Sequence, residues 1–451
     1  YLGLIMPDGQ TVASEFAPKF PAQMDDVSYG TTQPGTTGEA PRTGYFRTPT
    51  PGARNGGADT LLLLERVTLS RASGPFTGAV TLTMSGAAEG QRIRYVVAPP
   101  AATGATVSEP DAAADEYTGP IAIGTSAIVR AAVFSADNIQ RGFSTTGHYV
   151  RLATSGAARV DTFASQLPLL VIDTHGSGAL EKDGVDRPAW LYTWNRPAAG
   201  GTALTTTPAA TSPLTTAVRG SSSAFFPKKG YNLRLTDSAG KDNPLPLYGL
   251  AAFDRWALVG PWAYDATFLH NVLIYDLSNR IGRWAPRTQL VEVFFNADGG
   301  DLDYSDYAGI YILTDALRVD KKRVDIAALS PKDVSGAAVT GGYLLKFDVP
   351  ADDDFSFKTR RNYPSAEYGL IVTSPNAADL VTAQRDYIKG YAQSFEDALY
   401  ADSAGGWRER THLDYMDRDS WVDHHILNTL SMNIDAFVRS AYLMKDRRGR
   451  L

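Results

Sequence analysis

Residues 219–235 read RGSSSAFFPKKGYNLRL, a small-residue turn after a cation followed by two lysines and a predicted strand. Gly220 permits a ligand to approach the backbone closely, and the serines centred on Ser222 supply hydroxyl and N–H donors. Two lysines then lead into a predicted strand. Because neighbouring strand residues face opposite sides, only one of Lys228 and Lys229 can point at a given site.

A strand lysine facing phosphates is the group with which kinases hold a nucleotide. The stretch is therefore a candidate phosphate-binding site. The alternative interpretation is a solvated basic loop that closes a hairpin.

A second candidate follows a predicted amphipathic helix over residues 418–432. Asn433 and Asp435 fall where this helix should end, and there a carboxamide and a carboxylate can hold Mg²⁺ or orient an attacking hydroxyl. Alternatively, the two side chains only cap the helix and its turn. The apolar face of the helix is predicted to consist of Val422, Ile426 and Leu430.

Composition limits the possible functions. A chain of 451 residues predicts two or three domains, and 43% hydrophobic with 20% charged residues indicates a globular protein. The net charge of −6 gives no electrostatic reason to expect a nucleic-acid partner. The absence of cysteine excludes a thiol nucleophile, a disulfide and a cysteine-ligated metal. No apolar run approaches the ~20 residues of a membrane-spanning helix.

Residues 1–57 are rich in turn-forming residues. The runs Asp26-Val-Ser-Tyr-Gly30 and Thr48-Pro-Thr-Pro-Gly-Ala-Arg-Asn55 resemble the last part of a lamin tail domain, a small β-sandwich often attached to exported bacterial proteins. The resemblance implies a partial lamin tail domain here. A linker rich in proline and glycine is the alternative.

Residues 58–155 have an all-β pattern, with period-two runs such as Ala127–Phe134 separated by turn clusters. This pattern predicts an immunoglobulin-like sandwich. Tyr117-Thr-Gly-Pro-Ile121 and Arg130-Ala-Ala132 make the segment similar to the small C-terminal sandwich of chitobiases. No catalytic chemistry is evident in it, and a spacer role is the alternative.

Residues 160–451 are predicted to form an α+β domain. We expect a surface loop over residues 197–213. The expected strands are residues 167–173, 290–295, 309–313 and 342–347, and the expected helices are residues 265–282, 377–400 and 418–432.

This third segment resembles the spore-coat CotH kinase family over nearly its whole length. The resemblance implies a distant, atypical protein-kinase-like fold that binds ATP with Mg²⁺ or Mn²⁺ and phosphorylates Ser or Thr of proteins. The matching runs are Arg219–Tyr231, Pro246–Gly249, Trp256–Pro261, Asp265–Leu273, Gly309–Leu313, Gly341–Tyr343 and Asn433–Asp435.

The resemblance also implies roles for single residues. Asp435 would be the catalytic aspartate, as general base or metal ligand, and Asn433 would support it. The phosphates would be contacted by Arg219, Ser222 and either Lys228 or Lys229. Because the helix expected at 265–282 contains no glutamate, Glu292 becomes the candidate ion-pair partner of the lysine. An ordinary outward-facing strand residue is the alternative for Glu292.

Two departures from the family pattern bear on activity. His270-Asn271 stands where the family usually has arginine before asparagine, which weakens a phosphate contact there. The family's second acidic motif should follow the strand ending near Lys445, but the chain stops at Leu451 and also begins without Met. We therefore expect a fragment cut at both ends and inactive as it stands.

Other combinations of polar residues are weaker. The run Asn296–Asp306 is rich in oxygen ligands but lacks the EF-hand spacing, so a solvated loop is favoured over a Ca²⁺ site. Asp173, His175 and Ser177 suggest a hydrolase, but no Gly-x-Ser-x-Gly elbow is present.

Three functions remain. The first is an exported kinase, secreted or at the cell surface, that acts on surface or coat proteins. The second is a cell-surface adhesion protein that keeps a kinase-like fold without catalysis, and the third is a structural component of the cell envelope. ATP binding separates the first from the others.

Overall fold

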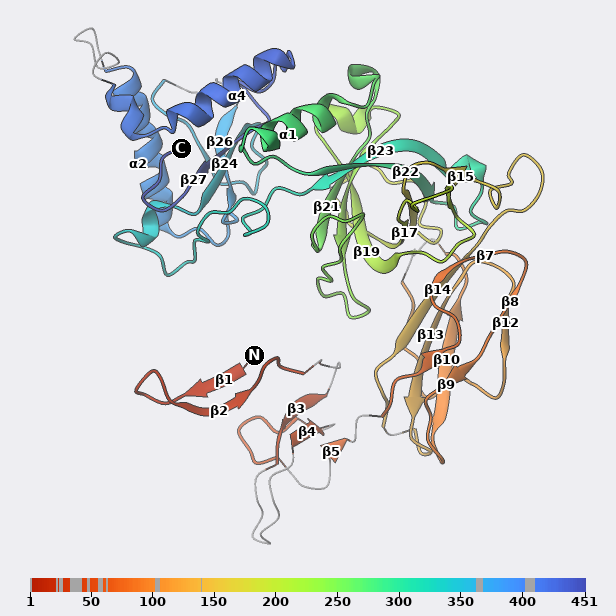
Figure 1. Cartoon of the computed structure of the whole chain (residues 1–451). Helices are drawn as coiled ribbons and strands as arrows, with labels where there is room; N and C mark the ends of the chain where they lie inside the picture. Colours follow the sequence, from red (N-terminus) through yellow and green to blue (C-terminus); the bar gives the residue numbers. More distant parts are fainter. Residues whose placement is uncertain are drawn as a thin grey trace.

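The computed structural model describes residues 2–21, 23, 27–32, 43–46, 49–55, 60–61, 64–101, 106–138, 140–361, 368–401 and 410–451. Strands predominate, and these residues contain three α-helices. Two small sheets, a β-sandwich, a closed barrel and a sheet with helices follow one another along the chain (Figure 1). No helix in the described ranges is long and apolar enough to cross a membrane.

The N-terminal residues form two small antiparallel sheets. Asp8 stabilises the turn in the first sheet, because its Oδ1 accepts hydrogen bonds from the backbone N–H groups of Gln10 and Thr11 (2.9 and 2.8 Å). Asp26 and Thr48, from the two lamin-tail runs, lie outside the described residues. The first sheet consists of β1 (Leu2–Ile5) and β2 (Val12–Phe16), and the second of β3 (Ser28–Thr31), β4 (Thr43–Phe46) and β5 (Thr60–Leu61).

The next unit is a β-sandwich with one apolar core that includes Leu82, Ile93, Val129, Val133 and Tyr149. Its larger sheet has the order β11 (Asp115–Glu116), β10 (Arg92–Ala98), β13 (Ala127–Phe134), β14 (Thr145–Arg151), β7 (Gly74–Phe76). The smaller sheets pair β12 (Ile121–Ile123) with β8 (Val80–Leu82), and β6 (Thr68–Leu69) with β9 (Met84–Ser85).

A closed seven-stranded barrel follows, and its interior is filled by side chains such as Leu191, Leu233, Trp256, Leu258 and Leu313. Its strand order is β16 (Leu169–Asp173), β17 (Arg187–Trp194), β19 (Ala210–Arg219), β20 (Gly230–Leu235), β21 (Arg255–Val259), β23 (Tyr307–Asp315), β22 (Thr288–Asn296). Strands β22 and β16 close the barrel as a parallel pair.

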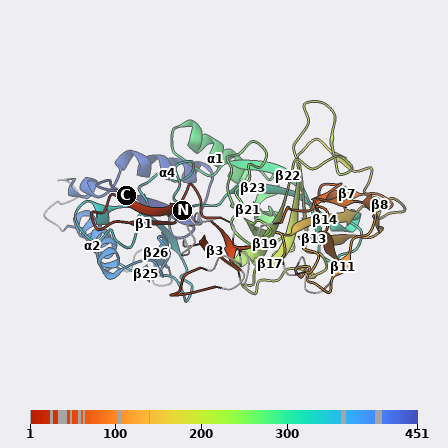
Figure 2. The same ribbon diagram turned by 90° about the horizontal axis from the view of Figure 1, so that it is seen from below.

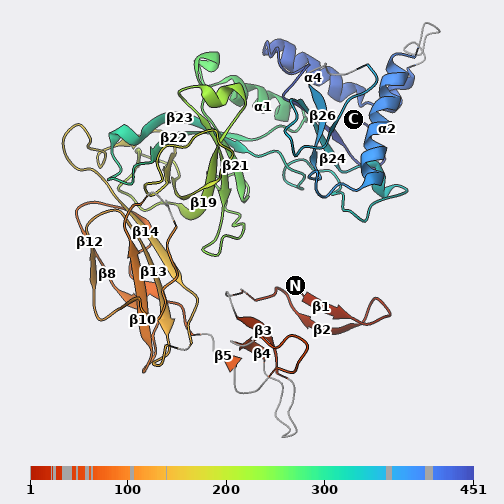
Figure 3. The same ribbon diagram turned by 180° about the vertical axis from the view of Figure 1, so that it is seen from behind.

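Strand β16 is buried along its whole length. Leu170 and Ile172 point into the barrel core, whereas Leu169 and Val171 pack outside it with Leu152 at the end of the sandwich. A strand covered on both faces is expected to be continuously apolar, which explains the uninterrupted Leu-Leu-Val-Ile run. The sandwich therefore abuts the outer surface of the barrel, as the view from behind shows (Figure 3).

The C-terminal part is a four-stranded sheet of order β25 (Ser356–Phe357), β26 (Gly369–Ser374), β24 (Tyr343–Asp348), β27 (Ala441–Lys445). Helix α2 (Thr382–Leu399) packs Ile388 and Ala392 into its core. Helix α1 (His270–Arg280) lies between this sheet and the barrel, and helix α4 (Arg418–Leu430) lies beside the sheet next to α1 (Figures 1 and 2). An ion pair joins Arg283, just after α1, to Asp423 of α4 at 2.6 Å.

Short elements complete the described structure. They are the strand pair β15 (Ala164–Ser165) and β18 (Thr202–Ala203), and the 3₁₀ turns η1 (Ser222–Phe225), η2 (Ala263–Asp265), η3 (Tyr304–Asp306), η4 (Ala338–Thr340) and η5 (Thr411–Asp414).

The structure corrects three expectations. Residues 197–213 are not all loop, because they contain β18 and the start of β19, where small and polar residues hide the strand pattern. Helix α1 begins at His270, since the buried carboxylate of Asp265 accepts from the N–H groups of Leu269 and His270 (3.2 and 3.1 Å) and so stands before the helix. The α+β prediction describes the C-terminal sheet and its helices, but the barrel was not predicted.

Candidate functional site

Arg219 is the last residue of β19, on the face opposite the buried Val218. Its guanidinium is half-buried and has no hydrogen-bond or ion-pair partner within the described ranges. Burial lowers the pKa of Arg219, and the neighbouring Tyr442, Tyr275 and Tyr264 oppose this effect. An arginine keeps its charge in such a setting, so this is an uncompensated cation where the barrel, α1 and β27 meet.

The loop after Arg219 depends on its glycine. Gly220 has φ +104°, and a Cβ built on it would lie 2.2 Å from Ser223 Oγ. The positive φ favours glycine at this turn, and any larger residue would also have to displace the Ser223 hydroxyl. Ser222 begins η1 with an exposed side chain that forms no hydrogen bond to the described part of the chain.

Lys228 turns inward. Its Nζ donates to the carbonyl of Ile310 on β23 (2.5 Å) and lies 4.7 Å from the ring centre of Phe268 and 4.8 Å from that of Tyr311. Burial lowers the pKa of Lys228, and the charge of Glu292 opposes this shift. Lys228 is therefore held at one position over two aromatic rings.

Lys229 points elsewhere. Its Nζ donates to Glu181 Oε2 (2.7 Å) and to the carbonyl of Leu180 (3.1 Å). Both lysines precede β20 (Gly230–Leu235), so the expected alternation along a strand does not explain their directions. Lys228 is the one beside a cavity.

Glu292 does not form the predicted ion pair. Its Oε1 accepts from Ser165 (2.9 Å) and its Oε2 accepts from the hydroxyl of Tyr307. Glu292 lies on β22 where this strand pairs with β16, opposite Leu169. Neighbouring side chains thus bind both of its carboxylate oxygens. Its influence on Lys228 is electrostatic, without a salt bridge among the residues described.

A cavity of about 360 Å³ opens beside Lys228. Its walls are mostly apolar, which suits a planar ring better than a sugar or a free phosphate. The 3₁₀ turn η2 (Ala263–Asp265) contributes Ala263 to this cavity and Tyr264 to the surroundings of Arg219. The turn therefore lies near both Lys228 and Arg219. The residues around the cavity are Lys228, Pro261, Trp262, Ala263, Ala266 and Phe268.

Asn433 and Asp435 lie beyond the end of α4. The side chain of Asn433 donates to Asn428 Oδ1 (3.0 Å) and its backbone N–H donates to the Asn428 carbonyl (2.9 Å), so it caps the helix. Asp435 is half-exposed and pairs with Arg439 (3.1 Å). Among the residues described, no hydrogen bond or ion pair joins Asp435 to Arg219 or Lys228.

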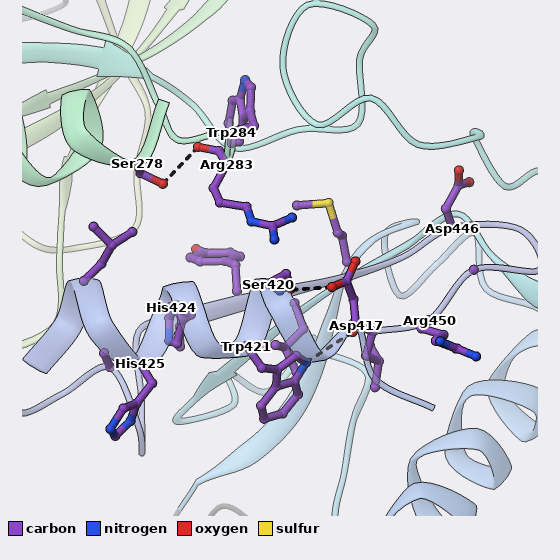
Figure 4. A pocket seen from close by; sticks show the side chains of 18 of the residues that line it. Ser278, Arg283, Trp284, Asp417, Ser420, Trp421, His424, His425, Asp446 and Arg450 are labelled. Carbon is purple, nitrogen blue, oxygen red and sulfur yellow. Dashed lines mark hydrogen bonds between the residues drawn. The ribbon is translucent and has the colours of Figure 1, made fainter. Parts of the chain in front are cut away.

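The predicted apolar face of α4 is largely exposed. Val422, Ile426 and Leu430 are 49%, 56% and 68% exposed. The opposite side of the helix lines a cavity of about 640 Å³. Figure 4 shows Trp421 of α4 and the segment carrying Arg283 and Trp284 on different sides of this cavity.

Polar side chains of the oxygen-rich run from Asn296 to Asp306 make hydrogen bonds and an ion pair within the protein. Asn296 is buried and accepts from Gly299, Asp301 pairs with Arg151 at 2.6 Å, and Asp303 and Asp306 form a capping box. The run is therefore not simply a solvated loop, since its ends belong to β22 and η3 and these contacts occupy its side chains.

Sequence reasoning missed the three tyrosines around Arg219. Tyr264, Tyr275 and Tyr442 come from a 3₁₀ turn, a helix and a strand that are distant in sequence. No local pattern distinguishes them from other tyrosines, since only the packing of α1 and β27 against the barrel brings them together.

Comparison with known proteins assigns the C-terminal part of the chain to a family. A family model described as CotH kinase protein matches residues 216–451, which is more than half of the chain. The match begins within β19 and includes Arg219, Lys228, Glu292 and Asp435. No curated protein matches the chain.

Proposed function

The chain belongs to the CotH kinase protein family, and from this we propose that it binds ATP with Mg²⁺ or Mn²⁺ as part of a kinase that transfers the γ-phosphate to Ser or Thr of surface or coat proteins. The observation that carries the proposal is the uncompensated cation of Arg219 at the junction of barrel, α1 and β27. A half-buried guanidinium without a partner is unfavourable unless an anion binds it, and phosphate oxygens fit its planar donor set.

The cavity beside Lys228 supports the same proposal. Its size lies within the range of small-molecule sites, about 300–1,000 Å³, and its walls of Trp262 and Phe268 suit a purine ring. Arg219 and Ser222 would then contact the phosphates with Lys228. Lys229 takes no part, because Glu181 already binds it.

We assign Asp435 the role of general base or metal ligand, with Asn433 fixing its turn. In the reaction, the acceptor hydroxyl oxygen bonds to the γ-phosphorus, the bond to the β–γ bridging oxygen breaks and ADP leaves. The hydroxyl proton would pass to Asp435 when this residue acts as base. Arg439 must release the carboxylate first, since it now occupies one oxygen.

ATP affinity in the presence of Mg²⁺ or Mn²⁺ tests the proposal. Losing a charge-assisted contact costs roughly 1.5–3 kcal/mol, so Arg219→Ala should bind ATP about 10- to 100-fold more weakly. Arg280→Ala is the matched control, because Arg280 pairs with Asp276 on the exposed side of α1. If neither metal supports ATP binding by the unmodified protein, only a fold-level likeness to kinases remains.

A non-catalytic adhesion protein is the second candidate. Two observations favour it: Asp435 is engaged by Arg439, and Glu292 forms no ion pair with Lys228. ATP binding without phosphate transfer, together with cell or glycan binding, would support this candidate. Glycan binding by the sandwich would also separate it from a purely structural envelope component.

We further propose three units, 1–57, 58–155 and 160–451, of an exported protein at the cell surface. In the first, the lamin-tail resemblance is supported by Asn55, whose side chain donates to the Thr31 carbonyl (2.9 Å) and accepts from Thr50 (2.7 Å). One resembling run is thereby bound to the strand formed by the other. In the second, the single core between sheets supports the chitobiase-like sandwich.

A further inference from the structure

The junction between sandwich and barrel encloses two histidines and one carboxylate that the proposed nucleotide site does not use. His148 lies on β14 of the sandwich, Asp173 ends β16 of the barrel, and His175 follows two residues later. All three are at most 1% exposed. One potential ligand atom from each lies within 4.8 Å of the others.

Hydrogen bonding determines the tautomer of His148. The hydroxyl of Tyr192 donates its only proton to the His148 carbonyl (2.9 Å), so towards the ring it can only accept. His148 Nδ1, the ring atom in contact with that hydroxyl, therefore carries the proton. Nε2 is left with a lone pair, which faces Asp173 Oδ2 at 3.7 Å.

The same argument applies to His175. Its Nε2 lies 3.1 Å from the carbonyl of Ala98, which can only accept, so Nε2 carries the proton and Nδ1 the lone pair. Asp173 Oδ1 accepts from the backbone N–H of His175 (2.7 Å). His148 Nε2, His175 Nδ1 and Asp173 Oδ2 have no hydrogen-bond partner in the described chain.

Each of the three residues thus offers a buried acceptor without a donor, and one potential ligand atom of each lies within 4.8 Å of the others. We propose that they bind one divalent transition-metal ion, Zn²⁺ being the expected species, at the sandwich–barrel junction. Two imidazoles with one carboxylate suit zinc, whereas Ca²⁺ and Mg²⁺ prefer oxygen ligands throughout. Donors around a tetrahedral zinc stand about 3.3 Å apart, so the 3.7 Å between His148 and Asp173 needs only a small contraction.

A proton shared between Asp173 and His148 satisfies the cluster less well. The separation of 3.7 Å exceeds hydrogen-bonding distance, and His175 Nδ1 would still lack a partner. A metal ion would engage all three atoms at once.

The ligands come from both sides of the junction, so the ion would fasten the sandwich to the barrel. Apolar packing and several polar contacts of the polypeptide already join the two units there. Ser126 donates to the Gly300 carbonyl (3.1 Å), Leu152 forms a β-bridge with Leu302, and His148 stacks on Trp190 with ring centres 5.0 Å apart. Binding at this cluster should therefore stabilise the two units as one body.

Metal content of the whole, untagged chain tests the proposal. We expect one equivalent of zinc by inductively coupled plasma mass spectrometry, and a melting temperature that falls on chelation and recovers on adding Zn²⁺. His148→Ala and His175→Ala should each lose the bound equivalent. The matched control combines His424→Ala with His425→Ala. It removes two histidines from α4 and should retain the bound zinc.

X-ray absorption at the zinc edge decides the matter if the buried variants do not fold. Imidazole scattering from two histidines in the unmodified protein supports the site. The proposal is overturned if the chelated protein neither takes up Zn²⁺ nor gains thermal stability from it. It is equally overturned if the α4 control loses the metal, because the ion would then be held on the surface.

Discussion

Lys228 and Lys229 are adjacent, yet their ammonium groups leave the chain in different directions. Lys228 Nζ reaches the Ile310 carbonyl on β23 (2.5 Å), whereas Lys229 Nζ pairs with Glu181 (2.7 Å). Two residues of equal charge and almost equal position therefore have different surroundings, and this makes each the natural control for the other.

Lys228→Ala should weaken ATP binding, while Lys229→Ala should leave it nearly unchanged. The first change removes the cation from the cavity. The second breaks a partly exposed pair worth about 0–1 kcal/mol and the hydrogen bond to the Leu180 carbonyl, both away from the cavity. We expect a loss of roughly 10-fold or more for Lys228→Ala, as for other charge-assisted contacts. Isothermal titration with Mg²⁺–ATP measures both. Equal losses in the two variants would contradict the assignment.

Arg439→Gln should strengthen metal binding if Asp435 is a metal ligand. Arg439 now pairs with the Asp435 carboxylate (3.1 Å), so its removal frees an oxygen. Mn²⁺ titration in the presence of ATP should show a several-fold gain, on the order of 1 kcal/mol. Asp435→Asn should show a loss.

The control for this prediction is Arg280→Gln on α1. It breaks another ion pair between residues four apart, Asp276–Arg280 at 2.7 Å, remote from the turn of Asp435. The same gain in Mn²⁺ affinity from this control would mean that net charge, and not the release of Asp435, is responsible.

Gly220→Ala should destabilise the phosphate loop. A Cβ there meets Ser223 Oγ at 2.2 Å, and φ is +104°. We expect a loss of about 1–3 kcal/mol in the free energy of unfolding, with weaker ATP binding. Gly240 also has a positive φ (+74°), but a Cβ there would meet no atom within 4 Å. The difference between Gly220→Ala and Gly240→Ala therefore measures the cost of the clash with Ser223. Urea unfolding compares the two, and equal losses would exclude the clash as the cause.

Lys445 should make stability rise with pH in the alkaline range. Its side chain is 1% exposed, and burial lowers the pKa of Lys445 from 10.5 to about 8, with Asp446 opposing the shift. Below the folded-state pKa both states are protonated and the cost of burial is fully present. Between the two pKa values the folded state has lost a proton that the unfolded chain keeps, so raising the pH favours folding.

We expect wild-type stability to gain about 1–2 kcal/mol between pH 8 and 9.5 relative to Lys445→Met. The comparison is confined to this range, because the pKa values of Tyr387 and Tyr391 are raised by burial and reverse the trend at higher pH. Urea unfolding at several pH values measures the difference. Parallel pH profiles for the two proteins would refute the prediction.

Much of the secondary structure could be predicted from local patterns. Ala127–Phe134 is a strand with the predicted bounds, and the predicted strands at 290–295 and 309–313 form the central parts of β22 and β23. Alternation and turn residues act over a few positions, so they are legible without knowledge of the fold. The strand in 210–213 was missed because its pattern is broken by Ser212 and Pro213.

The sequence alone identified the family through spaced motifs, and it identified Arg219, Lys228 and Asp435 as candidates, because residue type and order along the chain are sufficient for such a match. Tertiary structure decided which lysine faces the cavity, that Glu292 is bound by Ser165 and Tyr307, and that His148 meets Asp173 and His175. These outcomes depend on barrel closure and on the docking of the sandwich. Both join segments far apart in sequence, where no local periodicity carries information about contact.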